Sequence, residues 1–199
     1  MKTWPQDFDQ YAFSKAPDYK ESATREAFAA LMPLKTIVIY CYDPRARGIP
    51  NAVAKALGET YPGEPVTDDA GDTIGVTTTM LDVVVAGGRA VDALRSITVG
   101  QHLMGVENIV VVHHTHCGAT SYTKAGIEAA FEAEHGHSIA GVYPDESVCI
   151  SDFNSSLTHD VKLIREAPGT PPHVSVFGFL YDIDTHELIR VAEDIPADI

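Results

Sequence analysis

The sequence predicts an α/β fold with a mainly parallel β-sheet and helices on its faces. Short apolar runs rich in β-branched residues alternate with segments of helical periodicity along the 199 residues, and this alternation is typical of parallel sheets. Near the C-terminus, turn-forming residues separate two apolar runs, which predicts a hairpin and an antiparallel edge strand. With 45% hydrophobic and 21% charged residues, the composition is that of a globular protein. We expect a single domain over residues 1–199.

The N-terminal segment is predicted to be helical. Residues 7–32 carry apolar residues at helical spacing among charged ones, and Pro33 ends the pattern. The apolar positions are Phe8, Tyr11, Ala12, Ala23, Phe28 and Leu31. We interpret residues 1–33 as an N-terminal helical arm of one or two helices, which packs over the core or over a partner subunit.

The remaining elements follow from the alternation of apolar runs and turn signals. The predicted strands are 36–40, 81–85, 109–112, 173–181 and a returning strand at 188–191. The predicted helices are 50–58, 89–104, 120–135 and one that begins after Ser151 as its N-cap and ends before Pro168. Residues 58–79 are rich in Gly, Pro, Asp and Thr, which predicts a long loop of the kind that is often functional.

Potential metal ligands follow two of the predicted strands. Cys41 comes directly after the first, and His114 and Cys117 come just after the third. The carboxyl ends of parallel strands meet at one edge of a sheet, so we expect these side chains to converge. A turn at Gly118 lets residues three apart approach each other, which selects His114 together with Cys117. Two thiolates and one imidazole predict a zinc site with an open fourth position, typical of a catalytic metal.

Asp43 and Arg45 follow Cys41 at a spacing of two, so in an extended stretch all three project to one side. We expect Arg45 to hold Asp43 ionised and oriented, and Asp43 to accept a proton-bearing group near the metal. Taken alone, this stretch also fits a buried cysteine beside a surface ion pair, and the second cluster favours the metal site. Within that cluster, we expect His116 to point away and His113 to support the site or pack in the core.

Charge and cysteine content exclude several classes of function. Lys and Arg number 14 against 28 Asp and Glu, for a net charge of −14, which repels nucleic acid, anionic membranes and polyanionic substrates. A small neutral substrate is unaffected. No apolar run is long enough to span a membrane, and the first residues lack the apolar core of a signal peptide. Three cysteines do not make a disulfide framework, so we expect a reducing, cytoplasmic location.

The paired motif resembles the β-carbonic anhydrase family. C-x-D-x-R at 41–45 followed by H-x-x-C-G at 114–118 carries the resemblance, which covers about residues 36–120. The wording HHTHCG at 113–118, preceded by Arg95-Ser-Ile, resembles the small-subunit branch, which includes carbonyl sulfide hydrolases. The resemblance implies that Zn²⁺ is bound by three ligands and that two further residues form a catalytic dyad. The implied ligands are Cys41, His114 and Cys117, and the implied dyad is Asp43 and Arg45. It also implies a homodimer or homotetramer whose N-terminal helices embrace the neighbouring subunit.

One departure from the branch concerns the end of the second predicted strand. Members of the branch usually carry Arg-Asn-Ala-Gly-Gly, whereas this chain has valine at positions 84 and 85 before Ala86-Gly-Gly88. An apolar feature here favours a substrate less polar than carbon dioxide. We therefore expect a zinc-hydroxide enzyme that acts on a small linear triatomic gas, and specifically a hydrolase that converts carbonyl sulfide to hydrogen sulfide and carbon dioxide. Hydration of carbon dioxide to bicarbonate is the alternative, and carbon disulfide is a third candidate substrate.

A hypothesis of another class is a zinc-stabilised binding module without turnover. Asp43 would then be the fourth ligand of a closed metal site and would displace the water. Such a module requires Asp43 on the metal and Arg45 swung away from it.

Overall fold

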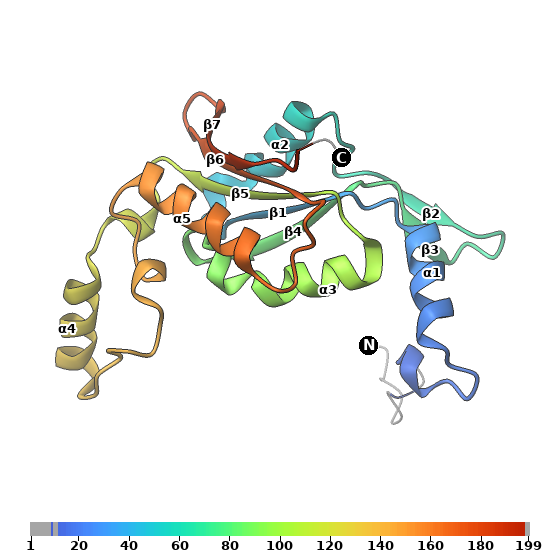
Figure 1. The fold of residues 1–199 in the computed structure, drawn as a ribbon, viewed down its shortest axis with the longest axis horizontal. Coiled ribbons are helices and arrows are strands. Elements are labelled where there is room, and N and C mark those ends of the chain that lie inside the picture. The colour runs from blue at the N-terminus through green and yellow to red at the C-terminus, as the bar shows by residue number, and fades with distance from the viewer. Residues whose placement is uncertain (1–8, 10–11, 198–199) are drawn as a thin grey trace.

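The computed structural model describes residue 9 and residues 12–197. Its centre is a five-stranded sheet in the order β4-β1-β5-β6-β7 (Figure 1). The strands are β1 (Thr36–Cys41), β4 (Met80–Val85), β5 (Asn108–His114), β6 (Ser175–Tyr181) and β7 (Leu188–Asp194). The pairs β1–β4, β1–β5 and β5–β6 are parallel, and β7 runs antiparallel to β6. The predicted sheet, with its antiparallel edge strand, is confirmed.

The central strands are apolar on both faces because both faces are covered. All six residues of β1 are buried, as are residues 109–114 of β5, and β-branched residues suit such doubly covered strands. The strand predicted at 109–112 extends through His113 and His114. Successive residues of a strand point to opposite faces, so these two histidines face different layers of the molecule.

Three helices cover the two faces of the sheet (Figure 1). They are α2 (Ile49–Leu57), α3 (Leu94–Met104) and α5 (Phe153–Glu166). On one face α2 packs Val53 into a cluster that also contains Tyr40, Cys41 and Cys117. On the other face α3 and α5 pack into an aliphatic cluster formed by Ile37, Ile39, Ala90, Ala93, Ile97, Val106, Ile109, Val111, Leu157, Val161, Ile164, Val174 and Val176.

The start of α5 differs by one residue from the prediction. The N-cap is Asp152, not Ser151, and its Oδ1 atom accepts a hydrogen bond from the Ser155 N–H at 2.7 Å. The carboxylate of an aspartate at this position satisfies a free N–H of the first turn. Ser and Asp are both favoured N-cap residues. With one of each at positions 151 and 152, the sequence alone does not tell which of them caps the helix.

The predicted helix at 120–135 is shorter and does not cover the sheet. Helix α4 (Lys124–His135) begins after Thr123, which caps it, and ends at Gly136 in the left-handed conformation, with φ of 72°. Among the described residues it buries no side chain, and it projects away from the sheet (Figure 1). The expectation that the helices lie on the sheet faces is therefore wrong for α4.

The predicted loop at 58–79 contains a short hairpin. Its antiparallel strands are β2 (Pro65–Thr67) and β3 (Thr73–Val76). The Oδ1 atom of Asp68 accepts hydrogen bonds from the N–H groups of Ala70 and Asp72, at 2.9 Å each, which closes the turn. The strands are short and mostly exposed, so the sequence shows no alternation of apolar and polar residues that would predict them.

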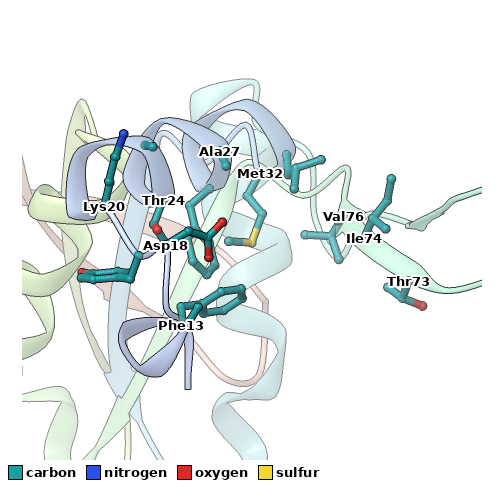
Figure 2. Close-up of a pocket in the computed structure, with 15 residues that line it drawn as sticks. Phe13, Asp18, Lys20, Thr24, Ala27, Met32, Thr73, Ile74 and Val76 are labelled. Atoms are coloured by element: carbon teal, nitrogen blue, oxygen red, sulfur yellow. The ribbon is translucent and has the colours of Figure 1, made fainter. Parts of the chain in front are cut away.

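The N-terminal arm contains α1 (Glu21–Leu31), preceded by a 3₁₀ turn at Phe13–Lys15. Phe8 and Tyr11, which were part of the predicted helical pattern, lie outside the described residues. The arm and β3 together line a largely apolar groove of about 810 Å³, with Phe13 and Met32 on the helical side and Ile74 and Val76 on the hairpin side (Figure 2). Within residue 9 and residues 12–197, no helix is long and apolar enough to cross a membrane.

Candidate metal centre

The two sequence clusters meet at the carboxyl end of the sheet. Cys41 is the last residue of β1 and His114 the last of β5, and these strands are neighbours. Cys117 follows in the turn after β5, and its Sγ atom lies 3.9 Å from that of Cys41. The potential ligand atoms of all three residues lie within 4.8 Å of one another. All three are buried, so they form a compact group that could hold a metal ion.

The hydrogen bonds of His114 fit a metal ligand. Its Nδ1 atom lies 2.9 Å from the carbonyl oxygen of Thr115 and donates to it. This contact places the hydrogen on Nδ1 and leaves a lone pair on Nε2, the usual arrangement for a metal-binding imidazole. The buried Nε2 atom has no hydrogen-bond partner in the described part of the chain. A metal ion would satisfy it, and a donor set of two sulfurs and one imidazole suits Zn²⁺.

The two cysteines are electrostatically coupled. The thiol of Cys117 donates to the Cys41 sulfur and lowers the pKa of Cys41. Burial opposes this shift, and the His114 ring and the backbone N–H groups of Asp43 and Gly87 add to it. The same contact with Cys41, together with burial, raises the pKa of Cys117. One thiolate is therefore favoured by the protein alone. A divalent cation between the sulfurs would favour ionisation of both, because metal binding releases thiol protons.

Asp43 and Arg45 form the expected ion pair, but the extended stretch predicted for them is wrong. Strand β1 ends at Cys41, and Asp43 is the N-cap of a 3₁₀ turn at Pro44–Gly48 that carries Arg45. The Oδ1 atom of Asp43 accepts from the backbone N–H and the Nε atom of Arg45, at 2.9 and 3.0 Å. Its Oδ2 atom accepts from Nη2 at 2.7 Å. This two-pronged contact holds the pKa of Asp43 well below its usual range. The carboxylate lies with Arg45 and is not part of the group of converging ligand atoms.

Arg45 also connects the two clusters. Its Nη2 atom donates to the carbonyl oxygen of His116 at 2.9 Å. His116 has a φ of 56°, in the left-handed region that few residues other than glycine adopt. Its side chain is 70% exposed, so it points away from the ligand group, as the sequence predicted. One guanidinium thus orients Asp43 and fastens the turn that carries Cys117.

The valines that replace the usual polar pair lie beside Cys41. In the register of β1 and β4, Val85 is opposite Cys41 and Val84 is opposite Tyr40. Val84 is 48% exposed and shares its strand face with Asp82. The Oδ2 atom of Asp82 accepts from the Tyr61 hydroxyl at 2.6 Å. An apolar side chain therefore lies exposed on this edge strand, near the carboxyl end of β1.

Sequence reasoning missed a buried ion pair behind the ligand group. The Nε and Nη2 atoms of Arg89 donate to the two carboxylate oxygens of Asp160 at 2.9 and 3.0 Å. The Nε2 atom of His113, a fully buried residue, lies 3.4 Å from Asp160 Oδ2. The paired residues are 71 positions apart, and neither sits in a recognisable motif. No local sequence pattern marks either residue as a member of a buried pair.

Comparison with known proteins finds sequence relatives of this chain. No protein-family model matches the chain. Over 102 residues, half of this chain, it is 31% identical to β-carbonic anhydrase 1 of Mycobacterium tuberculosis, and the match spans 59% of that relative's length. Over 178 residues, 76% of this chain, it is 27% identical to the carbon disulfide hydrolase of Acidithiobacillus thiooxidans and covers 85% of that relative.

A solved structure agrees with the sequence relatives. The carbonic anhydrase of Streptococcus mutans superimposes with a TM-score of 0.60 at 26% identity, over 81% of this chain and 86% of the other. The sheet order and the position of the ligand group at the carboxyl end of its strands agree with this likeness. In sequence and in fold, the chain is similar to β-carbonic anhydrases and to a carbon disulfide hydrolase.

Proposed function

We propose that this protein is a zinc-dependent hydrolase that converts carbonyl sulfide and water to hydrogen sulfide and carbon dioxide. The observation that carries the proposal is the convergence of two buried thiols and one imidazole beside an ionised Asp–Arg pair. A relative named carbon disulfide hydrolase, which matches 76% of this chain, supports a sulfur-containing substrate of the same linear shape.

The proposed zinc ligands are Cys41, His114 and Cys117. When bound, Zn²⁺ supplies Lewis acidity, which makes water a stronger acid and a better nucleophile near neutral pH. The orientation of His114, with Nδ1 on the Thr115 carbonyl, aims its free nitrogen at the sulfur atoms. Because those sulfurs lie 3.9 Å apart, we also propose a cytoplasmic location, where a reducing environment keeps them as thiols.

Asp43 and Arg45 are proposed to align the reacting water. An ionised carboxylate only accepts hydrogen bonds, so Asp43 accepts one from the water and turns an oxygen lone pair toward the substrate carbon. Arg45 keeps Asp43 ionised through its two-pronged contact and fixes its direction. Alignment of this kind raises the rate by orienting the reacting groups, and it does not require the substrate to carry a charge.

Carbonyl sulfide is the proposed substrate because it is neutral and linear and because its carbon–sulfur bond is less polar than a carbon–oxygen bond of carbon dioxide. Addition of water to its carbon gives thiocarbonic acid, and cleavage of the carbon–sulfur bond then releases hydrogen sulfide and carbon dioxide. The exposed Val84 offers this substrate an apolar surface where the branch usually carries a polar residue. The net charge of −14 does not oppose the approach of an uncharged gas.

Hydration of carbon dioxide to bicarbonate is the second candidate. It is favoured by the 31% identity to a β-carbonic anhydrase over half of the chain, and it uses the same ligands and the same Asp–Arg pair. The two candidate reactions differ in their products, and they favour different polarity in the residues around the ligand group. A direct assay of the products separates them.

The test measures loss of carbonyl sulfide from headspace and release of hydrogen sulfide by zinc-loaded protein, with Cys117→Ser as the control. Carbon disulfide hydrolysis and carbon dioxide hydration are measured on the same preparation. We expect rapid sulfide release from carbonyl sulfide that is lost in the control. If sulfide release equals the control and carbon dioxide is hydrated, the second candidate replaces the first. If no substrate turns over in a zinc-loaded protein, the non-catalytic module replaces both.

We also propose that the chain forms a homodimer or homotetramer. Helix α1 buries no side chain among the described residues, and its apolar side faces the groove that it shares with β3 (Figure 2). A second copy of the chain would cover these side chains, as an N-terminal arm that embraces its neighbour does. Light scattering after size-exclusion chromatography gives the mass. A monomer at all concentrations would contradict the proposal.

A further inference from the structure

The buried ion pair of Arg89 and Asp160 lies on the face of the sheet opposite the ligand group. The side chains are 3% and 1% exposed. Asp160 Oδ2 accepts from Arg89 Nε and from the backbone N–H of Ala90 at 3.1 Å, and Oδ1 accepts from Arg89 Nη2. The remaining nitrogen of the guanidinium, Nη1, donates to the carbonyl oxygen of Cys149 at 2.9 Å. Each of the three guanidinium nitrogens thus donates a hydrogen bond, and both carboxylate oxygens accept at least one.

Stability alone is a weak reason for such a pair. Removing two charges from water costs free energy that their attraction only partly offsets, and apolar residues of similar size often replace buried pairs without loss. The pair is more informative as a connector, because its contacts reach three chain segments that adjoin or pack against the proposed ligands.

The first connection runs to Cys41 through the turn at Ala86–Gly88. Arg89 follows this turn directly, and the turn packs against the end of β1. A β-carbon added at Gly88 would lie 2.7 Å from the Val112 carbonyl oxygen and 3.1 Å from the Cys41 nitrogen. The turn therefore touches the Cys41 backbone with no room to spare. Anchoring Arg89 fixes where that turn lies.

The second connection runs to Cys117 through the Cys149 carbonyl. The next residue, Ile150, donates its N–H to the carbonyl oxygen of Ala119 at 2.8 Å. Ala119 belongs to the 3₁₀ turn whose first backbone hydrogen bond, from the Thr120 N–H at 3.0 Å, is accepted by Cys117. Arg89 Nη1 therefore holds the segment on which the turn after Cys117 rests.

The third connection runs to His114 through its neighbour in β5. His113 is fully buried and its Nε2 atom lies 3.4 Å from Asp160 Oδ2, which is an electrostatic contact longer than a good hydrogen bond. Because His113 and His114 are consecutive in one strand, a displacement of the first ring moves the backbone that carries the second.

From these three connections we propose that Arg89 and Asp160 are positioning residues for the metal centre, which together set the geometry of its ligands from the far side of the sheet. They touch no ligand side chain and act through the turn at Ala86–Gly88, the Cys149 segment and His113. The inference rests on the proposed function, in that it assumes the three ligands bind zinc. Outer contacts of this kind typically change metal affinity by about 10–100-fold when removed.

The test replaces both charges together, as Arg89→Met with Asp160→Leu, so that no unpaired charge stays buried. The matched control is Arg165→Met with Asp194→Leu. It removes another Arg–Asp pair, with Arg165 Nε 2.8 Å from Asp194 Oδ1, and Arg165 lies in the same helix as Asp160. Asp194 is opposite Val176 and thus at the other end of the sheet. Zinc affinity is measured by competition with a chromophoric chelator, and ligand geometry by the visible absorption of the Co²⁺-loaded protein.

We expect the first double variant to bind zinc about 10–100-fold more weakly than the wild type and to show shifted cobalt bands, whereas the control matches the wild type in both. Arg89→Lys keeps the charge but loses the two-pronged contact with Asp160 and the contact with the Cys149 carbonyl. We expect this variant to fold and to have a zinc affinity between those of the wild type and the first double variant. Wild-type affinity and cobalt bands in Arg89→Lys and in any folded double variant would overturn the inference. If the wild type itself binds no zinc, the proposed function fails, and the inference fails with it.

Discussion

His113 and His114 are consecutive, chemically identical and fully buried, yet they lie in opposite layers of the molecule. His114 faces the cluster that contains Cys41 and Cys117, and one of its ring nitrogens lies within 4.8 Å of both sulfur atoms. His113 faces α5, where Asp160 lies 3.4 Å from its ring nitrogen. We call these layers the ligand face and the support face.

The comparison shows that strand geometry, not side-chain chemistry, places one histidine in the proposed ligand group and the other in the opposite layer. Because β5 continues to its last residue as a regular strand, the two rings have no choice of side. Burial lowers the pKa of His113, so this ring stays neutral near pH 7. In our proposal the ligand face binds the metal, whereas the support face carries the buried Arg89–Asp160 pair next to His113.

The strongest test of this division is His114→Ala. His113 points to the other face and does not replace the missing ligand, so we expect zinc affinity to fall by roughly two orders of magnitude or more, given about 10–16 kcal/mol for a complete structural zinc site. Zinc content after dialysis measures the effect, with His137→Ala as an exposed control. Full zinc retention in His114→Ala would break the comparison.

The next effect is expected from Asp43→Ala, which leaves the ligand face intact. Loss of the aligning carboxylate should lower turnover by about 10²–10⁴-fold, with zinc content unchanged. Asp184→Ala is the matched control, because its carboxylate is exposed and lies 3.9 Å from the His116 ring. A fully active, zinc-loaded Asp43→Ala protein would show that the assigned role of Asp43 is wrong.

On the support face, His113→Ala should act on stability more than on metal binding. Truncating a fully buried ring leaves a cavity, and we expect the free energy of unfolding to fall by about 2–4 kcal/mol. Zinc should still bind with one ion per chain. Urea denaturation and zinc titration measure the two quantities. A loss of zinc as severe as in His114→Ala would contradict the separation of the faces.

Acid stability tests the charges of the support face. Burial opposes ionisation of Asp160, but the contacts with His113 and Arg89 outweigh it and lower its pKa. A carboxyl whose pKa is lower in the folded state stabilises the fold above its unfolded pKa of about 3.9, and this contribution is lost as the pH falls through the folded value. We expect the unfolding free energy of the wild type to drop more steeply below about pH 4 than that of Arg89→Met with Asp160→Leu. Parallel curves would contradict this.

The smallest effect is expected from Val84→Arg, at the margin of the ligand face. A polar residue on this exposed strand position should lower carbonyl sulfide turnover relative to carbon dioxide hydration by about tenfold, the scale of a single pocket contact. The ratio of the two rates on one preparation measures it, and Val142→Arg, an exposed position in the chain segment after α4, is the control. An unchanged ratio would remove Val84 from the argument for carbonyl sulfide.

Much of the fold could be predicted because its signals are local. The β-branched run at β1 and the apolar spacing of Leu157, Val161 and Ile164 in α5 are readable in short windows of sequence, and the structure buries them. The convergence of Cys41 with His114 and Cys117 was also predictable, since parallel strands end at one edge. The β2–β3 hairpin was not, because its strands are exposed and bury little.

The buried charges of the support face could not be predicted for a different reason. Arg89 and Asp160 are 71 residues apart, and a charge that pairs with another charge through the fold leaves no local pattern. Helix α4 shows the opposite failure. Its sequence has helical spacing, but spacing does not say whether a helix covers its own sheet, and the described residues of α4 bury nothing.

The hydrogen bond from Arg45 to the His116 carbonyl has a consequence for how the centre forms. This bond joins residues 71 positions apart without the help of a metal. The conformational entropy of bringing the two clusters together is therefore lost when the chain folds and not when the metal binds. Zinc-finger modules, in contrast, order their chains only as the metal arrives. We therefore expect uptake of zinc here to resemble the loading of a rigid chelator, with little change in backbone order on binding.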